Sequence, residues 1–321
     1  MDIGVLTVPL RDQSLEDALA YLDGIGVDAV ELGCGGHPGD EHLPPDEYLD
    51  DEGAQADLRD LLAEHDLRVS ALAAHDNPLH PDADRADSAD EDLRNAIRLA
   101  DQLGVGTVTC FSGLPAGAPG DSTPNWIVAP WPGEHLEAQS HQWDVALEYW
   151  TDLAEFAEDH GVDVAIEMHP NMLVYEPTGL LRLRDATSDR IGANFDPSHL
   201  YWQGIEPAAA IRYLGEEGAI HHVHAKDTGL YDENVRVKGV LDTVPYDESV
   251  DRSWLFRTVG YGHGEEHWKD VVTALRMVGY DGALSIEHED TLTSSREGLE
   301  KAVELLDRAV FETDPGEAFW A

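Results

Sequence analysis

Three histidines and a lysine lie close together in segment 219–227, which reads Ala-Ile-His-His-Val-His-Ala-Lys-Asp. If this segment is a β-strand, its side chains alternate between two faces, so His222, His224 and Lys226 project together. Two neutral imidazoles on one face suit a divalent metal ion, because each offers a lone pair. From this segment alone, an equal alternative is a pair of buried histidines that hydrogen-bond to the backbone.

Carboxylates follow three other strand-like segments of the chain. These are residues 164–166 before Glu167, residues 192–195 before Asp196 and residues 284–286 before Glu287. A carboxylate next to buried apolar residues is unfavourable unless it is paired with a charge or coordinated. Each one alone is compatible with a helix cap or a salt bridge. Together with the histidine segment, they indicate a metal site in a fold that brings the four segment ends together.

Strand-like and helix-like segments alternate along the whole chain. The predicted strands span residues 2–9, 28–32, 68–74, 107–112, 162–168, 191–195, 220–225 and 283–286. The predicted helices span residues 14–24, 50–66, 88–103, 143–159, 177–186, 207–214, 267–277 and 295–310. Eight strands that alternate with helices predict one α/β domain over residues 1–321, a closed parallel (β/α)₈ TIM barrel. In that fold the active site lies at the carboxyl ends of the strands, where the acidic residues and histidines occur.

Two long connections interrupt this alternation, at residues 113–141 and 228–265. Both follow predicted strands, so we expect them on the active-site side of the barrel. Loops of this length in a compact domain are usually functional lids or disordered insertions. The first connection is rich in proline and glycine and carries Trp126 and Trp131. We interpret it as a loop that covers the substrate.

The charge of the chain is strongly acidic, with 65 Asp and Glu against 20 Lys and Arg and a formal net charge of −45. The acidic residues are spread over the predicted helices instead of being gathered in a tail. This pattern is typical of a protein adapted to high salt, and we expect a halophilic source. The same charge disfavours nucleic acid as a partner, because phosphate contacts need a basic surface.

We predict that the melting temperature rises steeply between low and molar potassium chloride. Repulsion between surface carboxylates destabilises the fold in dilute salt, whereas at about 1 M salt the Debye length is only about 3 Å and the repulsion is screened. Thermal melting followed by circular dichroism over a potassium chloride series measures this effect. A melting temperature that does not change with salt would contradict the halophilic interpretation.

Membrane segments, thiol sites and nucleotide sites have no support in the sequence. No apolar run approaches the roughly 20 residues of a membrane helix, and the start of the chain does not resemble a signal peptide. We therefore expect a cytoplasmic protein with no membrane partner. Cys34 and Cys110 are isolated, so they predict neither a disulfide framework nor a thiolate metal site. No Walker-type or GxGxxG loop is present, which leaves a nucleotide cofactor unsupported.

Four motifs carry a resemblance to a known family. They are Ile166-Glu167, Asp196-Pro197-Ser198-His199, the segment 222–227 and Ser285-Ile286-Glu287-His288. Over essentially its whole length the chain resembles the sugar isomerase and epimerase superfamily with the xylose-isomerase-like TIM barrel, which also includes the AP endonucleases of that fold. The resemblance implies one divalent metal ion, held by Glu167, Asp196, His224 and Glu287.

The implied ligands are three carboxylates and one imidazole, a set that favours Mn²⁺, Mg²⁺ or Co²⁺ over a thiolate-preferring ion. We expect Mn²⁺, with Mg²⁺, Co²⁺ and Zn²⁺ as alternatives, and no other cofactor. The resemblance also implies that His199 binds a substrate hydroxyl group and that His222 supports the metal ligand or faces the substrate. Lys226 ranks first among the other candidate substrate-binding residues, because it shares a face with His222 and His224. The remaining candidates are His37, His75, His169, Arg257 and His263.

The implied reaction is proton transfer on a small-molecule sugar or cyclitol that carries a carbonyl group. A metal ion that chelates the carbonyl oxygen and the adjacent hydroxyl group stabilises the negative charge of an enediolate. We expect Glu167 to remove the proton from the carbon beside the carbonyl group and Glu287 to return a proton. Return at the same carbon gives epimerisation, return at the neighbouring carbon gives isomerisation, and expulsion of a β-hydroxyl group gives dehydration.

The residues after the last histidine of segment 219–227 bear on the substrate. The sugar 3-epimerases of the family carry a glutamate and an arginine there, whereas this chain has Lys226 and Asp227 followed by a long connection. This continuation resembles a broader group of isomerase-like proteins and inositol-pathway dehydratases. A dehydratase that acts on a keto-inositol is therefore the alternative to an isomerase or epimerase.

Three classes of function remain, and their metal content separates them. A metal-dependent isomerase, epimerase or lyase needs about one ion per chain, an AP-endonuclease-like repair enzyme about three, and a non-catalytic sugar-binding protein none. The acidic charge argues against the second class, and the complete ligand set argues against the third. The sequence leaves open whether the protein forms a homo-oligomer.

Overall fold

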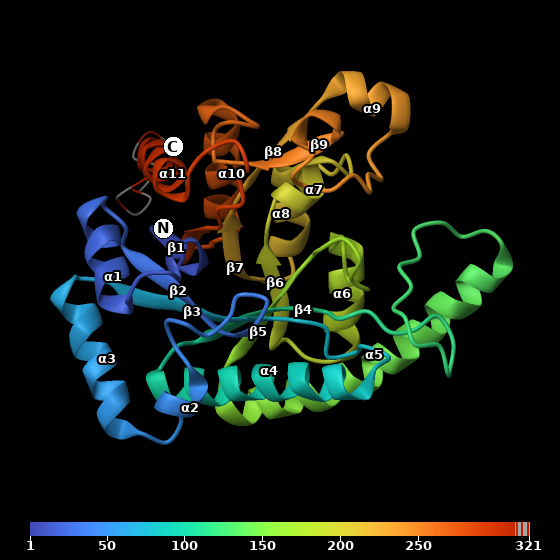
Figure 1. Cartoon of the computed structure of the whole chain (residues 1–321), viewed down its shortest axis with the longest axis horizontal. Coiled ribbons are helices and arrows are strands. Elements are labelled where there is room, and N and C mark those ends of the chain that lie inside the picture. Colours follow the sequence, from blue (N-terminus) through green and yellow to red (C-terminus); the bar gives the residue numbers. More distant parts are fainter. Residues whose placement is uncertain (312, 314–315, 317–319, 321) are drawn as a thin grey trace.

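Eight parallel strands close into a barrel in the computed structural model, which describes residues 1–311, 313, 316 and 320 (Figure 1). Around the barrel their order is β1, β10, β7, β6, β5, β4, β3 and β2. Their bounds are β1 (Asp2–Leu6), β2 (Ala29–Gly36), β3 (Arg68–His75), β4 (Thr107–Phe111), β5 (Asp163–Glu167), β6 (Ile191–Phe195), β7 (Ile220–Ala225) and β10 (Ala283–Ile286). Each strand overlaps a predicted one, and the predicted TIM barrel is confirmed.

Helices surround the barrel and connect consecutive strands. The longer ones are α1 (Leu15–Gly24), α3 (Glu52–Glu64), α4 (Ala83–Leu103), α5 (Gly133–His160), α6 (Pro177–Ala186), α8 (Pro207–Gly215), α10 (Glu265–Met277) and α11 (Ser295–Ala309). The short ones are α2 (Pro45–Tyr48), α7 (Ser198–Tyr201), α9 (Asp232–Lys238) and the 3₁₀ turns η1 (Val8–Leu10) and η2 (Ser249–Asp251). Within the described ranges, none of these helices has both the length and the apolar character needed to cross a membrane.

Local sequence signals explain where α1 begins and where α4 ends. Ser14 precedes α1, and its hydroxyl oxygen accepts a hydrogen bond from the backbone N–H of Asp17 at 3.1 Å, as the capping pattern predicts. Such a cap contributes about 1 kcal/mol. Gly104 follows α4 with φ +76°, a left-handed conformation that glycine adopts without steric cost. These signals set the points at which the chain turns back toward the barrel.

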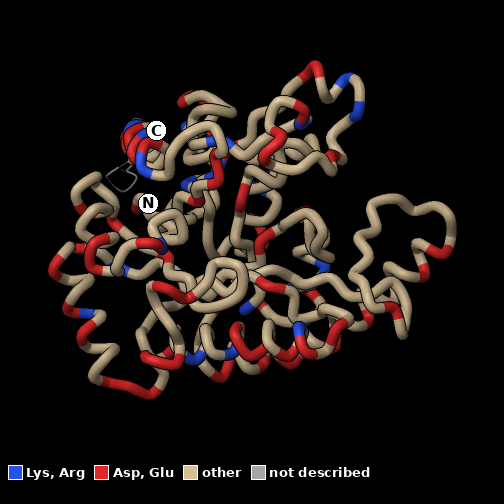
Figure 2. Tube along the Cα trace, viewed as in Figure 1, with Lys and Arg blue, Asp and Glu red and all other residues tan. Residues whose placement is uncertain are grey.

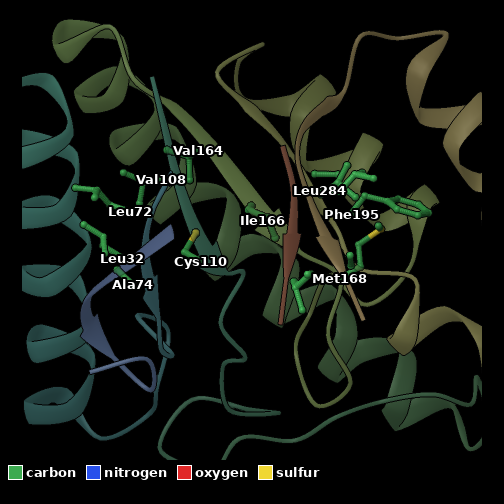
Figure 3. Packing of buried hydrophobic residues seen from close by; sticks show 14 of the residues in the cluster. Leu32, Leu72, Ala74, Val108, Cys110, Val164, Ile166, Met168, Phe195 and Leu284 are labelled. Atoms are coloured by element: carbon green, nitrogen blue, oxygen red, sulfur yellow. The ribbon is translucent and has the colours of Figure 1, made fainter. Parts of the chain in front are cut away.

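The apolar core lies between the barrel strands and the surrounding helices. Val164, Ile166 and Met168 occupy alternate positions in and just after β5, and all three are completely buried (Figure 3). Because side chains alternate along a strand, the positions between such residues point into the barrel. Several of these interior positions are polar and fully buried, namely Glu31, Thr109, Asn194, His224 and Ser285. The barrel therefore encloses a polar centre within an apolar shell.

The two long connections contain more regular structure than the sequence predicted. The helix predicted from Trp143 begins at Gly133, so the irregular part of the first connection is shorter than expected. The second connection holds β8 (Asp227–Leu230), α9 and β9 (Trp254–Arg257), and the two strands pair antiparallel. Both segments follow strands of the barrel, β4 and β7.

Aromatic residues join the two connections to each other. Trp202, Trp254 and Phe256 form a small buried cluster, and Trp126 from the first connection packs against it. Trp131, by contrast, is 82% exposed. The role of the first connection as a cover over the substrate stays a prediction.

Acidic residues occur along the helices on the outside of the barrel, whereas Lys and Arg are fewer and scattered (Figure 2). The first half of α4, for example, reads Ala-Asp-Arg-Ala-Asp-Ser-Ala-Asp-Glu-Asp. The negative charge is thus distributed over the folded surface of the described chain. The predicted rise of the melting temperature with salt depends on this distribution, because it places like charges near one another on the surface.

Candidate active site

The four predicted metal ligands lie together at the carboxyl ends of four adjacent strands. Glu167 ends β5, Asp196 follows β6, His224 is on β7 and Glu287 follows β10. One ligand atom from each residue lies within 4.8 Å of those of the others. We call this group the ligand cluster. The structure therefore brings together all four residues that the sequence analysis assigned to one metal ion.

The donor atoms of the ligand cluster fit a divalent ion. His224 directs Nδ1 into the cluster, at 3.3 Å from Glu167 Oε2 and 3.2 Å from Glu287 Oε2. Asp196 Oδ1 accepts a hydrogen bond from the backbone N–H of Ser198 at 2.8 Å, and the buried Oδ2 lies 3.2 Å from both Lys226 Nζ and His199 Nε2. Three carboxylates and one imidazole are donors that suit Mn²⁺, Mg²⁺, Co²⁺ or Zn²⁺.

Burial and neighbouring charges shift the pKa values of the carboxyl groups in the ligand cluster in opposite directions. Burial raises the pKa of Glu167, but the hydrogen bond from His199 and the nearby His224 and His75 rings outweigh it and hold that pKa well below its usual value. Burial also raises the pKa of Asp196, but the charges of Lys226 and His199 lower it to about 2. Both carboxyl groups are therefore ionised at neutral pH, the form that holds a cation or accepts a proton.

Three further histidines surround Glu167. His199 Nε2 donates a hydrogen bond to Glu167 Oε1 at 2.9 Å, and His75 Nε2 lies 3.2 Å from Glu167 Oε2. Burial lowers the pKa of His199, but the charge of Asp196 outweighs it and raises that pKa to about 9. The His169 ring lies 4.3 Å from the His199 ring between centroids, and burial lowers the pKa of His169 to about 3. The site thus holds a charged imidazole and a neutral one side by side.

Lys226 is buried beside the ligand cluster although it carries a charge. Its Nζ atom lies 2.6 Å from Glu287 Oε2, 2.9 Å from Glu289 Oε2 and 3.2 Å from Asp196 Oδ2. Burial lowers the pKa of Lys226, but Glu287 and Glu289 outweigh it and raise that pKa well above the usual value. The ammonium group also lies 4.5 Å from the centroid of the Phe256 ring. Lys226 therefore connects two cluster carboxylates to Glu289, whose side chain is 49% exposed.

A cavity of about 390 Å³ opens onto these residues. This volume is in the range of small-molecule sites and suits a monosaccharide or cyclitol. Its charged wall is formed by Glu167, Glu287, Glu289 and Lys226, and Lys226 is the one Lys or Arg in the described lining. The other walls include four imidazoles, those of His37, His75, His169 and His288, and several apolar side chains, among them Leu6, Phe111 and Met172.

Besides His263, which is described below, three of the predicted substrate-binding residues are not part of the described lining of this cavity. His199 lies behind Glu167 as described above, and His222 lies deeper in the barrel, with Nε2 3.0 Å from Glu31 Oε2. Arg257, on β9, pairs with Asp290 at 3.1 Å. Contact between these three side chains and a substrate stays a prediction.

Asp227, the residue after Lys226, holds the end of the second connection. Its Oδ2 atom accepts hydrogen bonds from the backbone N–H groups of Gly260, Gly262 and His263 at 3.1, 3.0 and 2.8 Å. A Cβ atom at Gly262 would lie 2.3 Å from the Thr228 carbonyl oxygen, so only glycine allows this approach. The His263 ring also turns toward Asp227, at 2.8 Å, and is not part of the described cavity lining.

Sequence reasoning missed two polar residues at the centre of the barrel. Glu31, on β2, is fully buried and contacts both His222 and His224. The Asn194 amide, on β6, donates a hydrogen bond to Glu167 Oε2 at 3.3 Å. The available signal was a single polar residue inside an otherwise apolar strand, which is costly to bury without a partner.

A family described as "Xylose isomerase-like TIM barrel" has a sequence model that matches residues 19–309. A relative over nearly the whole chain is the uncharacterized protein YfiH of Bacillus subtilis (strain 168), which is 36% identical to this chain over 314 residues. The match covers 97% of this chain and 99% of YfiH. The relationship therefore extends over the whole barrel.

Two solved structures resemble this one closely in fold. The crystal structure of a D-tagatose 3-epimerase-like protein superposes with a TM-score of 0.64 at 23% identity and covers 96% of this chain and 98% of that chain. The structure of the IOLI protein "with a binding zinc atom" gives a TM-score of 0.68 at 19% identity and covers 98% of this chain and 100% of that chain. At these identities the two structures show a shared fold.

Proposed function

The chain belongs to the xylose isomerase-like TIM barrel family, and we propose that it is a metal-dependent isomerase or epimerase of a sugar or cyclitol. One observation carries this proposal: two ionised carboxylates, Glu167 and Glu287, border the same cavity and also belong to the ligand cluster. Paired carboxylates at a cation site serve proton transfer beside a carbonyl group. Two proteins of similar fold support the same class, one D-tagatose 3-epimerase-like and one with a binding zinc atom.

Glu167, Asp196, His224 and Glu287 would hold the metal ion, for which we propose Mn²⁺. When bound there, the ion would polarise the substrate carbonyl group and stabilise the negative charge that develops on its oxygen. The donor set supports this assignment, because one ligand atom from each of these three carboxylates and one imidazole lies within 4.8 Å of the others.

Glu167 is placed to remove the proton. It lines the cavity, and His199 and Asn194 donate hydrogen bonds to its two oxygens at 2.9 and 3.3 Å. These contacts fix the plane of the carboxylate, and its low pKa keeps it ionised and ready to accept a proton. A base held in one orientation reacts faster than a freely rotating one, because less entropy is lost in the transition state.

We propose that Glu287 relays the second proton from Lys226. Lys226 Nζ donates hydrogen bonds to Glu287 Oε2 and to Glu289 Oε2, so the ionised Glu287 can take a proton from the ammonium group and pass it to the intermediate. In each turnover Glu167 gains one proton from the substrate and Lys226 loses one through Glu287. Glu167 then releases its proton to solvent, and Lys226 regains one from solvent through Glu289, whose side chain is 49% exposed.

The product depends on what happens to the intermediate after the first proton transfer. A proton returned to the same carbon gives an epimer, and a proton returned to the neighbouring carbon gives an aldose–ketose isomer. If a β-hydroxyl group leaves instead, the reaction is a dehydration. The ammonium group of Lys226, next to the cavity, is a donor that would assist such a leaving group, which keeps the keto-inositol dehydratase as the second candidate.

Removal and replacement of the metal ion tests this proposal. Protein stripped with a chelator in molar potassium chloride is mixed with Mn²⁺ and with a panel of ketopentoses, ketohexoses and keto-inositols, and products are identified by NMR. We expect conversion of at least one compound with Mn²⁺ and none in excess chelator, since the ion is needed to stabilise the developing charge. Conversion at an equal rate in excess chelator would contradict the proposal.

A further inference from the structure

Glu31 is a carboxylate buried in the middle of the barrel, below the ligand cluster and outside the described lining of the cavity. Its side chain accepts hydrogen bonds from two hydroxyl groups, Thr109 Oγ1 on β4 and Ser285 Oγ on β10, each at 2.7 Å. Two imidazoles of β7 complete the set, with His222 Nε2 and His224 Nε2 each 3.0 Å from Oε2. Donors from two adjacent strands and one more distant strand thus converge on one anion.

The contacts of Glu31 determine which nitrogen of His224 faces the ligand cluster. An ionised carboxylate only accepts hydrogen bonds, so the His224 nitrogen that contacts it must carry the proton. That nitrogen is Nε2, and the opposite one, Nδ1, lies 3.2 Å from Glu287 Oε2 and 3.3 Å from Glu167 Oε2. In the neutral ring, Nδ1 then holds the lone pair that a metal ion needs.

We propose that Glu31 is a positioning residue of the metal site: it fixes the orientation and tautomer of His224, with His222 as a second imidazole on the same carboxylate. Glu31 touches neither the cavity nor the other three cluster residues in the described contacts, so it acts through His224. A carboxylate behind a metal-bound imidazole also makes that imidazole a stronger ligand. The inference rests on the proposed function, because it assumes an ion at the ligand cluster.

Glu31, His222 and His224 also lie close enough together to hold an ion of their own. Two observations favour hydrogen bonding instead. The hydroxyl groups of Thr109 and Ser285 already donate hydrogen bonds to the oxygens of Glu31, and none of the five buried side chains is part of the described cavity lining. We therefore expect one ion per chain, bound above this network.

Glu31→Gln tests the inference, because glutamine has the same size but carries no charge and puts an N–H donor against other donors. We expect the affinity for Co²⁺ and Mn²⁺, measured by competition with a chromophoric chelator, to fall by about 10 to 100-fold. The visible absorption bands of the Co²⁺ protein at saturation should also change, since the His224 ring is no longer held. Circular dichroism in molar salt verifies that the variant is folded.

Asp227→Asn is the matched control. Asp227 is also a fully buried carboxylate that accepts several hydrogen bonds, but it holds the second connection and does not contact His224. We expect it to lower the melting temperature while the affinity for Co²⁺ stays within about twofold of wild type. A fall in affinity that is equal in the two variants would overturn the inference, because it would reflect general destabilisation.

Wild-type protein provides the second test, which does not depend on the folding of a variant. With Zn²⁺ bound, NMR of the imidazole nitrogens should show His224 protonated at Nε2 and ligated at Nδ1. The inference would be overturned if His224 bound the ion through Nε2 or if Glu31 bound a second ion. It would also be overturned if folded Glu31→Gln kept the Co²⁺ affinity and spectrum of wild type. Each of these results would leave the proposed function intact. Absence of any metal binding by wild-type protein would overturn the proposed function and this inference with it.

Discussion

Asp196→Asn is expected to lower the affinity for Mn²⁺ by more than about a hundredfold, because it removes an anionic ligand from a buried site. Ser198 N–H donates to Oδ1, and Oδ2 lies 3.2 Å from both Lys226 Nζ and His199 Nε2. Asparagine has the same size as aspartate, so the fold is retained while one negative charge is lost. Metal content after dialysis, measured by mass spectrometry, should fall from about one ion per chain to nearly none.

His224→Ala is expected to have the same effect, because it removes the one nitrogen ligand of the cluster. Asp290→Asn is the control: this carboxylate is also buried after β10, but it pairs with Arg257 and lies outside the ligand cluster. The control should keep its ion. Full metal occupancy with normal turnover in both Asp196→Asn and His224→Ala would disprove the assignment of the site.

Glu167→Gln is expected to lower kcat by about 10² to 10⁴-fold, the usual contribution of a general base. The glutamine carbonyl oxygen still fits among His199 and Asn194, so part of the metal affinity should survive, but the side chain no longer accepts a proton. Initial rates at saturating Mn²⁺ measure the effect, with metal content determined on the same sample. A variant that is fully loaded with metal and keeps more than about a tenth of kcat would show that another group is the base.

Glu289→Gln is the comparison for this variant. Glu289 contacts Lys226 at 2.9 Å, but it lies at the rim and its side chain is 49% exposed, so solvent can replace it as a proton carrier. We expect a loss of kcat of less than about tenfold, well below that of Glu167→Gln. Both carboxylates line the cavity, so the comparison separates the group proposed as the base from a neighbouring cavity carboxylate that solvent can replace.

The barrel was predictable from the sequence because parallel strands that are buried on both sides appear as short apolar runs bounded by turn residues. Glu167, Asp196 and Glu287 were predictable for the same reason: each ends such a run, and strand ends meet in a barrel. The start of α5 could not be predicted, because the proline- and glycine-rich composition before Gly133 obscured the first three turns of the helix.

The alternation of side chains along β7 predicted that His222, His224 and Lys226 share a face. It did not predict how deep in the barrel each side chain lies. His222 and His224 both reach Glu31 inside the barrel, whereas Lys226 lies past the end of the strand and reaches Glu287. Glu31 itself could not be assigned a role from sequence. Its hydroxyl partners are 78 and 254 residues away along the chain, so only the closed barrel places them together.

Solvent exchange at carbon tests the central claim most directly. The Mn²⁺ protein is incubated in D₂O with a ketose or keto-cyclitol that it converts, and NMR or mass spectrometry follows the hydrogen on the carbon beside the carbonyl group. The account predicts that deuterium enters at this carbon during turnover, because a proton bound to Glu167 or Glu287 exchanges with solvent, and that Glu167→Gln abolishes the exchange. Product formed without deuterium would contradict the account, since it would mean an intramolecular hydride shift.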